Sequence, residues 1–413
     1  MEYGDLPEGV REDVRPFGVS IADEELARMK ALLSLSRIPS TCYENSLPNG
    51  SRALGLRQEW LVNYRKKHEQ IINSFPKFKT TARNCTFHTT EIHFMALFSK
   101  KKAATPVLLL HGWPGSVLEF IPLLTLLRQK YPDPAHLPYH LIVPSLPGFG
   151  FSEAFPVGND YGVPHVANIM ADLMDDVLGF KDYVVQGGDI GSRIGRILAA
   201  TDPNCAAALL NYSPIPQPPG MSRDDLTDDE KAGLDRGNWF RGDGCAYALT
   251  QATRPATVGL VLSTNPLALL AWVGEKYLDW VDPASFRPRS VLQGSGTAYS
   301  RELMEEILLS VSLYWLTNTA HTSLYSYREC FAISGPTRSA HHYEEWHIAA
   351  PKKLGFSYFP KEVAPTPRAW IATSGNLVYW KEHAKGGHFA ALEQPVSILE
   401  DLEEFVTSCV GRD

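Results

Sequence analysis

Apolar residues recur at helical spacing in the first part of the chain. A helix is predicted over 23–35, where one face is formed by Leu26, Met29, Leu32 and Leu33. A second helix is predicted over 57–75, with a stripe made by Trp60, Leu61, Tyr64, His68, Ile71 and Ile72. We interpret residues 1–87 as an N-terminal arm that wraps around the rest of the protein, with its boundary near 76–84.

From residue 87 onwards, short apolar runs alternate with helical spacing. Period-two alternation predicts a strand over 87–98, and compact apolar runs predict buried strands at 106–110, 140–144, 183–186 and 206–212. Between them, a helix is indicated by Val166, Ile169, Met170, Leu173, Met174 and Val177. Strands that alternate with helices predict βαβ units, and therefore an α/β fold with a mostly parallel sheet.

This alternation stops at residues 213–219, where four prolines in six positions exclude both a helix and a central strand. The pattern is helical and rich in aromatic residues from 214 to 335, and strands are predicted again at 354–359 and 377–381. We therefore predict a core formed by 88–213 and 336–413, with 214–335 inserted as a helical lid. An insertion at the ends of the strands would cover a site there.

Composition narrows the class of protein. The 413 residues include 44% hydrophobic and 21% charged residues, as in ordinary folded proteins, and the formal net charge of −7 without a basic stripe argues against a nucleic-acid partner. Six cysteines without CxxC spacing indicate reduced thiols and no zinc site. The most apolar window, 258–273, is too short to span a membrane and is interpreted as a buried helical pair. Residues 1–15 lack the pattern of a signal peptide, so we expect a cytoplasmic protein.

The segment 184–192 has the build of a nucleophile elbow that carries Asp189 where a serine hydrolase carries serine. Such a turn lifts one side chain clear of the sheet and needs small neighbours, here Gly187, Gly188, Gly191 and Ser192. The alternative for this segment alone is an ordinary glycine-rich turn whose aspartate caps a helix.

Backbone donors for an oxyanion can come from two turns. In enzymes with such an elbow, the oxyanion hole combines the N–H of the residue after the nucleophile with an N–H from the loop after an earlier strand. Ile190 and Trp113 are the candidates, whereas His111 is interpreted as a residue of the turn and core because the hole needs only a backbone donor.

Among thirteen histidines, His388 is the candidate base. It lies in a glycine-rich loop after the last predicted strand and follows Asp189 in the chain order nucleophile, acid, histidine. Its carboxylate partner is expected at a strand end, which favours Glu362 moderately over Glu382 and Glu393.

Four motifs resemble those of the microsomal-type epoxide hydrolases: HGWP at 111–114, GGDIGS at 187–192, FPKE at 359–362 and GGHFAA at 386–391. The N-terminal segments IADEEL (21–26) and RIP (37–39) also resemble the N-terminal meander of that family, so the resemblance covers essentially the whole chain. It implies an α/β-hydrolase fold with helices on both faces of the sheet, an inserted lid and an N-terminal meander. It also strengthens the choice of Glu362.

The resemblance further implies two lid tyrosines, which match Tyr247 and Tyr327. With 17 tyrosines in the chain, composition alone does not select these two, and Tyr314 and Tyr325 are the nearest alternatives.

The residue types suit an epoxide. An aspartate carboxylate is ionised at neutral pH and can attack carbon without a general base, while two phenols can donate a proton to the departing oxygen. The resulting ester on Asp189 would be hydrolysed by water that His388, oriented by Glu362, deprotonates, with Trp113 and Ile190 binding the oxyanion. The expected partners are a small epoxide and water. No cofactor or metal is expected.

Three alternatives differ in chemistry. A haloalkane dehalogenase shares the aspartate but typically has an indole after the nucleophile, where this chain has Ile190. A serine esterase needs a GxSxG motif, which is absent, and a non-catalytic binding protein on the same fold is disfavoured by the full set of site residues. The chain lacks the N-terminal membrane anchor of the animal members, so a soluble protein is expected. A homodimer is compatible with the resemblance, but no residue demonstrates it.

Overall fold

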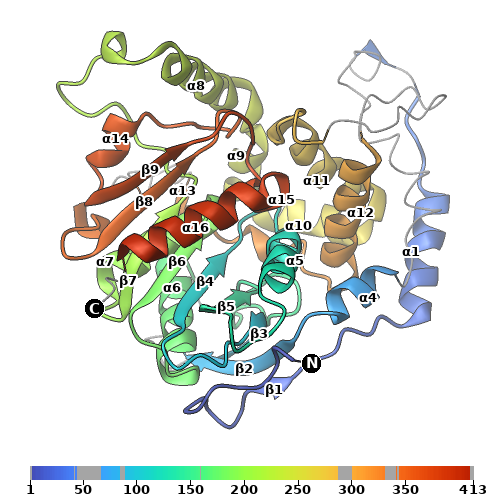
Figure 1. Cartoon of the computed structure of the whole chain (residues 1–413). Coiled ribbons are helices and arrows are strands. Elements are labelled where there is room, and N and C mark those ends of the chain that lie inside the picture. Colours follow the sequence, from blue (N-terminus) through green and yellow to red (C-terminus); the bar gives the residue numbers. More distant parts are fainter. Residues whose placement is uncertain are drawn as a thin grey trace.

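In the part of the chain that is described, a sheet of nine strands forms the centre of the computed structural model (Figure 1). The structure describes residues 2–40, 42–43, 67–83, 89–158, 160–286, 300–330, 341 and 344–409. In space the strand order is β1-β2-β3-β5-β4-β6-β7-β8-β9. The strands are β1 Arg15–Pro16, β2 Lys77–Arg83, β3 Thr89–Leu97, β4 Thr105–Leu110, β5 Tyr139–Pro144, β6 Tyr183–Gly187, β7 Cys205–Leu210, β8 Lys353–Tyr358 and β9 Leu377–Glu382.

The six strands from β5 to β9 in this order run parallel to one another. Strands β5 and β6 are buried along their whole length, which explains why their sequences are continuous apolar runs rather than alternating ones. The mostly parallel sheet predicted from the sequence is therefore confirmed. The carboxyl ends of β4, β6 and β8 lie on one edge of the sheet, and the elbow follows β6 there.

The sheet also has an antiparallel extension that the sequence analysis missed. Strands β1, β2 and β3 pair antiparallel with one another, and β3 pairs antiparallel with β5. The expected boundary at 76–84 instead contains β2, because its sequence KFKTTAR is too polar to stand out as an apolar run. The predicted N-terminal arm thus contributes two strands to the sheet, and its limit at residue 87 stays a prediction.

Helices cover both faces of the sheet. Figure 1 shows α5 Ile121–Lys130 and α16 Pro395–Cys409 on one face and α6 Val163–Asp172 and α7 Asp189–Thr201 on the other. Helix α7 buries one apolar side made by Ile190, Ile194, Ile197 and Leu198. Shorter helical turns complete these layers: η1 Val117–Phe120, η2 Leu173–Val177, α14 Arg368–Ala372 and α15 Ala390–Glu393.

Between β7 and β8 the chain forms the predicted run of helices: η3 Arg223–Asp225, α8 Asp228–Trp239, η4 Phe240–Gly244, α9 Ala246–Thr253, α10 Pro255–Thr264, α11 Pro266–Trp280, α12 Arg301–Leu316, η5 Thr322–Leu324, α13 Tyr327–Cys330 and η7 Glu344–Trp346. We call this segment the lid. Its predicted limits, 214–335, stay a prediction. Within the described part of the chain, no single helix is long and apolar enough to cross a membrane, although the bent pair α10 and α11 has the necessary length and composition together.

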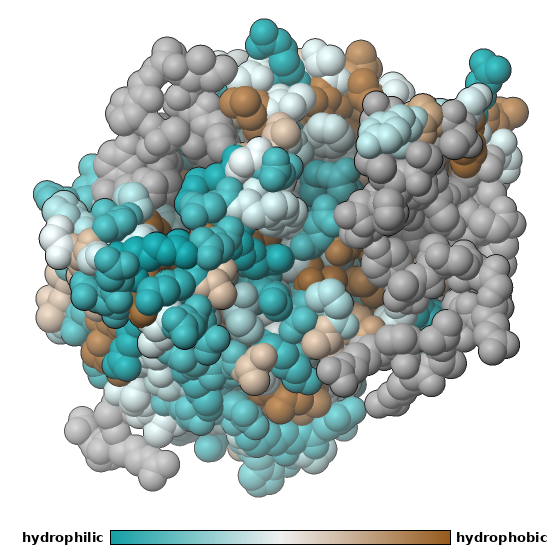
Figure 2. All heavy atoms as spheres, turned by 90° about the horizontal axis from the view of Figure 1, so that it is seen from above, coloured by the Kyte–Doolittle hydropathy of each residue, from teal (hydrophilic) through white to brown (hydrophobic). Residues whose placement is uncertain are grey.

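The helical pair predicted at 258–273 is present as α10 and α11, but only α11 is mainly buried. On α10, Leu260 and Val261 are 67% and 50% exposed. Seen from above, hydrophobic side chains are scattered among hydrophilic ones rather than joined in one continuous surface (Figure 2). This surface gives no specific argument for a second copy of the chain, and the homodimer stays a prediction.

The described residues of the N-terminal arm include the helices α1 Asp23–Leu35 and α4 Lys67–Asn73. Helix α1 has the predicted bounds, and it buries Met29 and Leu33 where it packs beside α11 of the lid. The first part of the helix predicted over 57–75 lies outside the described residues.

Candidate active site

The turn between β6 and α7 places Asp189 at the first position of the helix. Its backbone φ is +47°, a left-handed conformation that costs energy for a residue other than glycine and is typical of functional turns. Close packing around the turn requires glycine at position 191, because a Cβ there would overlap the carbonyl oxygen of Leu110. The elbow predicted from the sequence is therefore present in the structure.

One carboxylate oxygen of Asp189 is held by the loop after β4. The backbone N–H of Trp113 donates a hydrogen bond to Oδ1 of Asp189 over 2.9 Å. Ile190 follows as the second residue of α7, and N–H groups at a helix start have no partner within their helix. His111 is fully buried, and its Nε2 accepts a hydrogen bond from the backbone N–H of Leu146, in agreement with a role in the turn and core.

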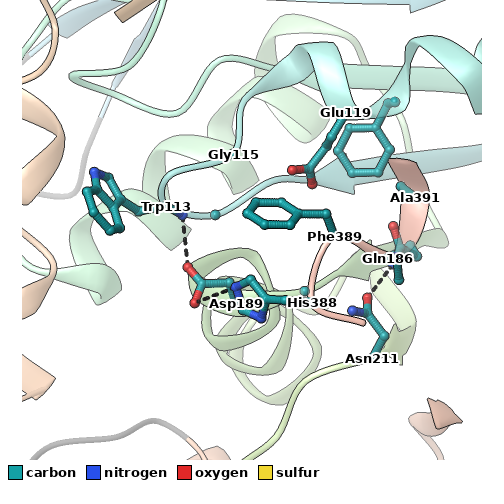
Figure 3. Close-up of a pocket in the computed structure, with 13 residues that line it drawn as sticks. Trp113, Gly115, Glu119, Gln186, Asp189, Asn211, His388, Phe389 and Ala391 are labelled. Atoms are coloured by element: carbon teal, nitrogen blue, oxygen red, sulfur yellow. Dashed lines mark hydrogen bonds and ion pairs between the residues drawn. The ribbon is translucent and has the colours of Figure 1, made fainter. Parts of the chain in front are cut away.

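The other carboxylate oxygen faces His388. Nε2 of His388 lies 3.6 Å from Oδ2 of Asp189, and Nδ1 of His388 is hydrogen-bonded over 2.6 Å to Oε1 of Glu362 (Figure 3 shows Asp189 between Trp113 and His388). Glu362 lies at the carboxyl end of β8, as predicted, and is only 2% exposed. The same Oε1 accepts a hydrogen bond from the backbone N–H of Val363, so this carboxylate is fixed in position.

Neither of the two rival carboxylates faces the imidazole of His388. Glu393 accepts hydrogen bonds from the backbone N–H groups of Asp282, Gly387 and Phe389. It therefore fixes the loop that carries the histidine rather than the ring itself. Glu382 accepts a hydrogen bond from the indole N–H of Trp380 in an exposed position.

Two lid phenols lie together and line a cavity with Asp189. The hydroxyl groups of Tyr247 and Tyr327 are 3.4 Å apart, and both side chains are buried. The ring of Tyr247 stacks on Trp113 at 5.2 Å between centroids, and Tyr327 meets the same indole edge-on at 5.5 Å. The indole whose backbone holds Asp189 thus also positions the two lid tyrosines.

The alternative tyrosines are placed differently. Tyr314 is buried and donates a hydrogen bond to the carbonyl oxygen of Gly115. The ring of Tyr325 packs edge-on against Phe149 and Phe155. Neither lines the lid-side cavity beside Asp189 described below.

Charge and burial set the protonation of the histidine. Burial lowers the pKa of His388, but the charge and hydrogen bond of Glu362, with a further contribution from Asp189, outweigh it and raise this pKa to about 9. The imidazole is thus protonated at neutral pH and forms an ion pair with Asp189 in the free protein. Any step that removes the charge of Asp189 lowers the pKa of His388.

For the two phenols, burial and the charge of Asp189 shift the pKa in the same direction. Burial raises the pKa of Tyr247 and Tyr327 well above the ordinary value of 10, and the charge of Asp189 contributes to the rise in both. Both hydroxyl groups are therefore protonated at neutral pH and can donate.

Two small cavities adjoin Asp189. The lid-side cavity, about 40 Å³, is lined among others by Tyr212, Tyr247, Trp280, Tyr327 and Arg193. The core-side cavity, about 20 Å³, is lined among others by Trp113, Glu119, Gln186 and Asn211. Asp189 and His388 are the lining residues that the two cavities share.

The sequence analysis missed Arg193, Glu119 and Gln186. Arg193 stands one helical turn after Asp189, and Gln186 stands three residues before it, so proximity to the elbow could have indicated both. Glu119 gave no comparable signal, because only the fold brings η1 beside the elbow. Among the described residues, no group of histidine, cysteine and acidic side chains has an arrangement that could hold a metal ion.

Comparisons with known proteins agree with this geometry. The family model "Epoxide hydrolase N terminus" matches residues 14–120, and the "alpha/beta hydrolase fold" model matches residues 105–239. A protein of Dothistroma septosporum assigned to the epoxide hydrolases is 39% identical, with 99% of this chain and 94% of that protein covered. Epoxide hydrolase 1 of Sus scrofa is 30% identical, with 96% and 89% covered. The structure of Aspergillus niger epoxide hydrolase superposes with a TM-score of 0.87 at 42% identity, covering 99% of this chain and all of that one.

Proposed function

Since this chain belongs to the epoxide hydrolases of the α/β-hydrolase fold and hydrolyses epoxides, we propose that it forms vicinal diols in two steps through a covalent ester on Asp189. The observation that carries this proposal is the placement of Asp189. One of its oxygens is held by the Trp113 N–H, and the other faces His388 without being within hydrogen-bond distance. The carboxylate is thus held in position by one hydrogen bond, and its second oxygen makes no hydrogen bond to His388.

In the first step, an oxygen of Asp189 forms a bond to an epoxide carbon, and the bond from that carbon to the ring oxygen breaks. The electron pair goes to the ring oxygen, which takes a proton from Tyr247 or Tyr327. Ester formation removes the negative charge of Asp189, which had raised the pKa of both phenols. The phenols therefore become stronger acids as the alkoxide develops.

In the second step, water adds to the carboxyl carbon of the ester, and one of its protons goes to Nε2 of His388. Trp113 and Ile190 supply the N–H groups for the oxyanion. Collapse breaks the ester bond, the diol oxygen takes the proton from His388, and the proton of the regenerated carboxylic acid passes to His388, which restores the ion pair. His388 can act as the base because the charge of Asp189 is absent in the ester, so its pKa falls and the imidazolium gives its proton to the tyrosinate formed in the first step.

Glu362 orients this base and stabilises its protonated form. Its hydrogen bond to Nδ1 of His388 leaves Nε2 pointed at Asp189. A dehalogenase is less well supported, because the residue after the nucleophile is the aliphatic Ile190 and the lid supplies two proton donors that a halide leaving group does not need.

A single turnover in ¹⁸O-labelled water tests the proposal. With enzyme in excess over styrene oxide, the first diol should contain no label, because its new oxygen comes from Asp189. The label should appear in the carboxylate of Asp189, which peptide mass spectrometry detects. Label in the first diol would show direct hydration by water and contradict the covalent route.

The control for this experiment uses excess substrate. After many turnovers the carboxylate of Asp189 has exchanged its oxygens with the labelled water, so the diol should then contain the label. Absence of label from peptides that do not contain Asp189 checks that the exchange is confined to this carboxylate.

A further inference from the structure

The core-side cavity contains polar groups that the two proposed chemical steps do not use. Gln186 is 2% exposed and donates from Nε2 to Oδ1 of Asn211, while its own Oε1 has no partner among the described residues. Glu119 lines the same cavity from η1. Buried polar atoms without a protein partner are commonly satisfied by an ordered water.

The cavity has the size for one water molecule. Its volume of about 20 Å³ exceeds the ~10–15 Å³ that a single water needs. Figure 3 shows Asp189, His388, Gln186, Asn211 and Glu119 around this space. Because the two phenols line the lid-side cavity, the epoxide and this water would approach Asp189 from two different cavities.

The position of the Glu119 carboxyl group requires a glycine at position 115. A Cβ at position 115 would overlap Oε2 of Glu119, so Gly115 leaves the space that this oxygen occupies. Glu119 also takes part in capping η1, because its carboxyl group receives a backbone hydrogen bond from Ser116. A capping role alone does not explain why this carboxyl group lines the cavity beside Asp189 and His388.

We propose that Glu119, together with Gln186, holds the hydrolytic water in the core-side cavity, where His388 deprotonates it for attack on the Asp189 ester. This inference rests on the proposed two-step function. The oxygen of the water forms the bond to Cγ of Asp189, one proton goes to Nε2 of His388, and the remaining hydrogen is shared between the carboxyl oxygen of Glu119 and Oε1 of Gln186. Two fixed partners leave one lone pair of the water directed at the ester carbon.

The electrostatic surroundings favour the neutral form of this carboxyl group. Burial raises the pKa of Glu119 to about 8, with His388 lowering it and Asp189 raising it. The phenols of Tyr277 and Tyr314 also face Glu119, and burial keeps both protonated. At neutral pH the group therefore accepts a hydrogen bond without placing a negative charge beside the oxyanion.

Single-turnover kinetics of Glu119→Leu and Glu119→Gln test the inference by separating ester formation from ester hydrolysis. In the leucine variant we expect hydrolysis to slow about 100-fold, as for a misplaced reactant, while ester formation changes less than about threefold. The glutamine variant keeps an acceptor oxygen in the same place, so its hydrolysis should stay within about threefold of the unmodified protein. Ser116→Ala, which removes the cap of η1 but keeps Glu119, should leave the ratio of the two rate constants unchanged.

The pH profile of hydrolysis provides a second readout. Relative to Glu119→Gln at the same pH, the hydrolysis rate of the unmodified protein should fall as the pH rises through about 8, because ionised Glu119 opposes the oxyanion, whereas the rising limb set by His388 is common to both proteins. Glutamine does not ionise, so Glu119→Gln should lack this decline, and this profile decides the question if the leucine variant does not fold. Equal slowing of both steps in Glu119→Leu, or an unchanged decline in Glu119→Gln, overturns the inference. Failure of the unmodified protein to form any covalent ester would instead overturn the proposed function, and this inference with it.

Discussion

Nε2 of His388 lies 3.6 Å from Oδ2 of Asp189, close enough for an ion pair but beyond hydrogen-bond length. This carboxylate oxygen therefore remains available for attack on carbon, with the imidazole next to it. This relationship separates the two steps of the proposed reaction, because ring opening uses Asp189 and the phenols, whereas ester hydrolysis uses His388 and Glu362.

Replacing His388 by glutamine should stop the reaction after its first step. Glutamine cannot take a proton from water, so the ester on Asp189 should form and persist. Intact-protein mass spectrometry after incubation with styrene oxide should show a mass increase of one substrate per chain, with diol formation slowed at least about 100-fold. Turnover at the normal rate in His388→Gln would exclude His388 as the base.

A second histidine serves as the matched control. His383 is hydrogen-bonded through Nε2 to the buried Asp401 and lines neither cavity beside Asp189. His383→Gln should therefore turn over without accumulating the adduct. If it accumulates the adduct as His388→Gln does, the effect comes from disturbed structure rather than from a lost base.

The fraction of covalent enzyme should depend on pH in a defined direction. Hydrolysis needs the neutral imidazole, and Glu362 raises the pKa of His388, so lowering the pH protonates the base and slows the second step. Ester formation does not need a neutral His388. Quenched steady-state samples should therefore contain more adduct at about pH 5 than at about pH 7.

Glu362→Gln tests the source of this pH dependence. Without the negative charge beside Nδ1, the pKa of His388 should fall and the rising limb of hydrolysis should move to lower pH. The maximum rate should also decrease, because the imidazolium formed during the reaction loses its partner. If the rising limb of the hydrolysis rate stays at the same pH as in the unmodified protein, the assigned role of Glu362 is contradicted.

Tyr327→Phe should slow ring opening more than ester hydrolysis. The variant keeps the ring beside Trp113 but loses one of the two hydroxyl groups that can protonate the alkoxide. Loss of one positioned acid lowers the rate of the step that it catalyses about 100-fold when no other group can replace it. The rate of ring opening should fall less if Tyr247 donates the proton instead. Stopped-flow measurement of the two phases should show the burst slowed and the hydrolysis phase nearly unchanged.

Tyr325→Phe is the control for this variant. Its hydroxyl group is buried without a partner among the described residues and lies outside the lid-side cavity. Both phases should therefore keep their rates. A slowed burst in Tyr325→Phe but not in Tyr327→Phe would reassign the acid to the alternative left open by the sequence.

Local patterns in the sequence were sufficient for the parallel strands and for the position of the elbow at Asp189. Buried parallel strands such as β6 are continuous apolar runs, and the elbow needs glycines at fixed offsets, so both leave a signature within a few residues. The resemblance to a family supplied Tyr247 and Tyr327, because nothing local distinguishes these from the other tyrosines.

Features that depend on distant contacts could not be predicted in the same way. Strand β2 is polar and becomes recognisable only through its pairing with β3. Glu119 shares a cavity with Gln186 across 67 positions of sequence, and only the packing of η1 against the elbow brings them together. The choice of Glu362 over Glu393 likewise rests on the direction of a side chain, which the sequence does not encode locally.

The elbow also predicts a large effect on stability from a single methyl group. In Gly191→Ala the new Cβ would overlap the carbonyl oxygen of Leu110 and lie 2.8 Å from that of His111. Backbone atoms of a central strand cannot move aside easily, so we expect a loss of about 1–3 kcal/mol despite the better helix propensity of alanine. Gly237→Ala in α8 is the matched control, since its nearest neighbours lie at 3.6 Å or more and the change should be neutral or stabilising by up to about 1 kcal/mol. Thermal unfolding midpoints of the two variants test this prediction. Equal midpoints would show that helix α7 tolerates a side chain against β4. The elbow would then be less tightly packed than the structure indicates.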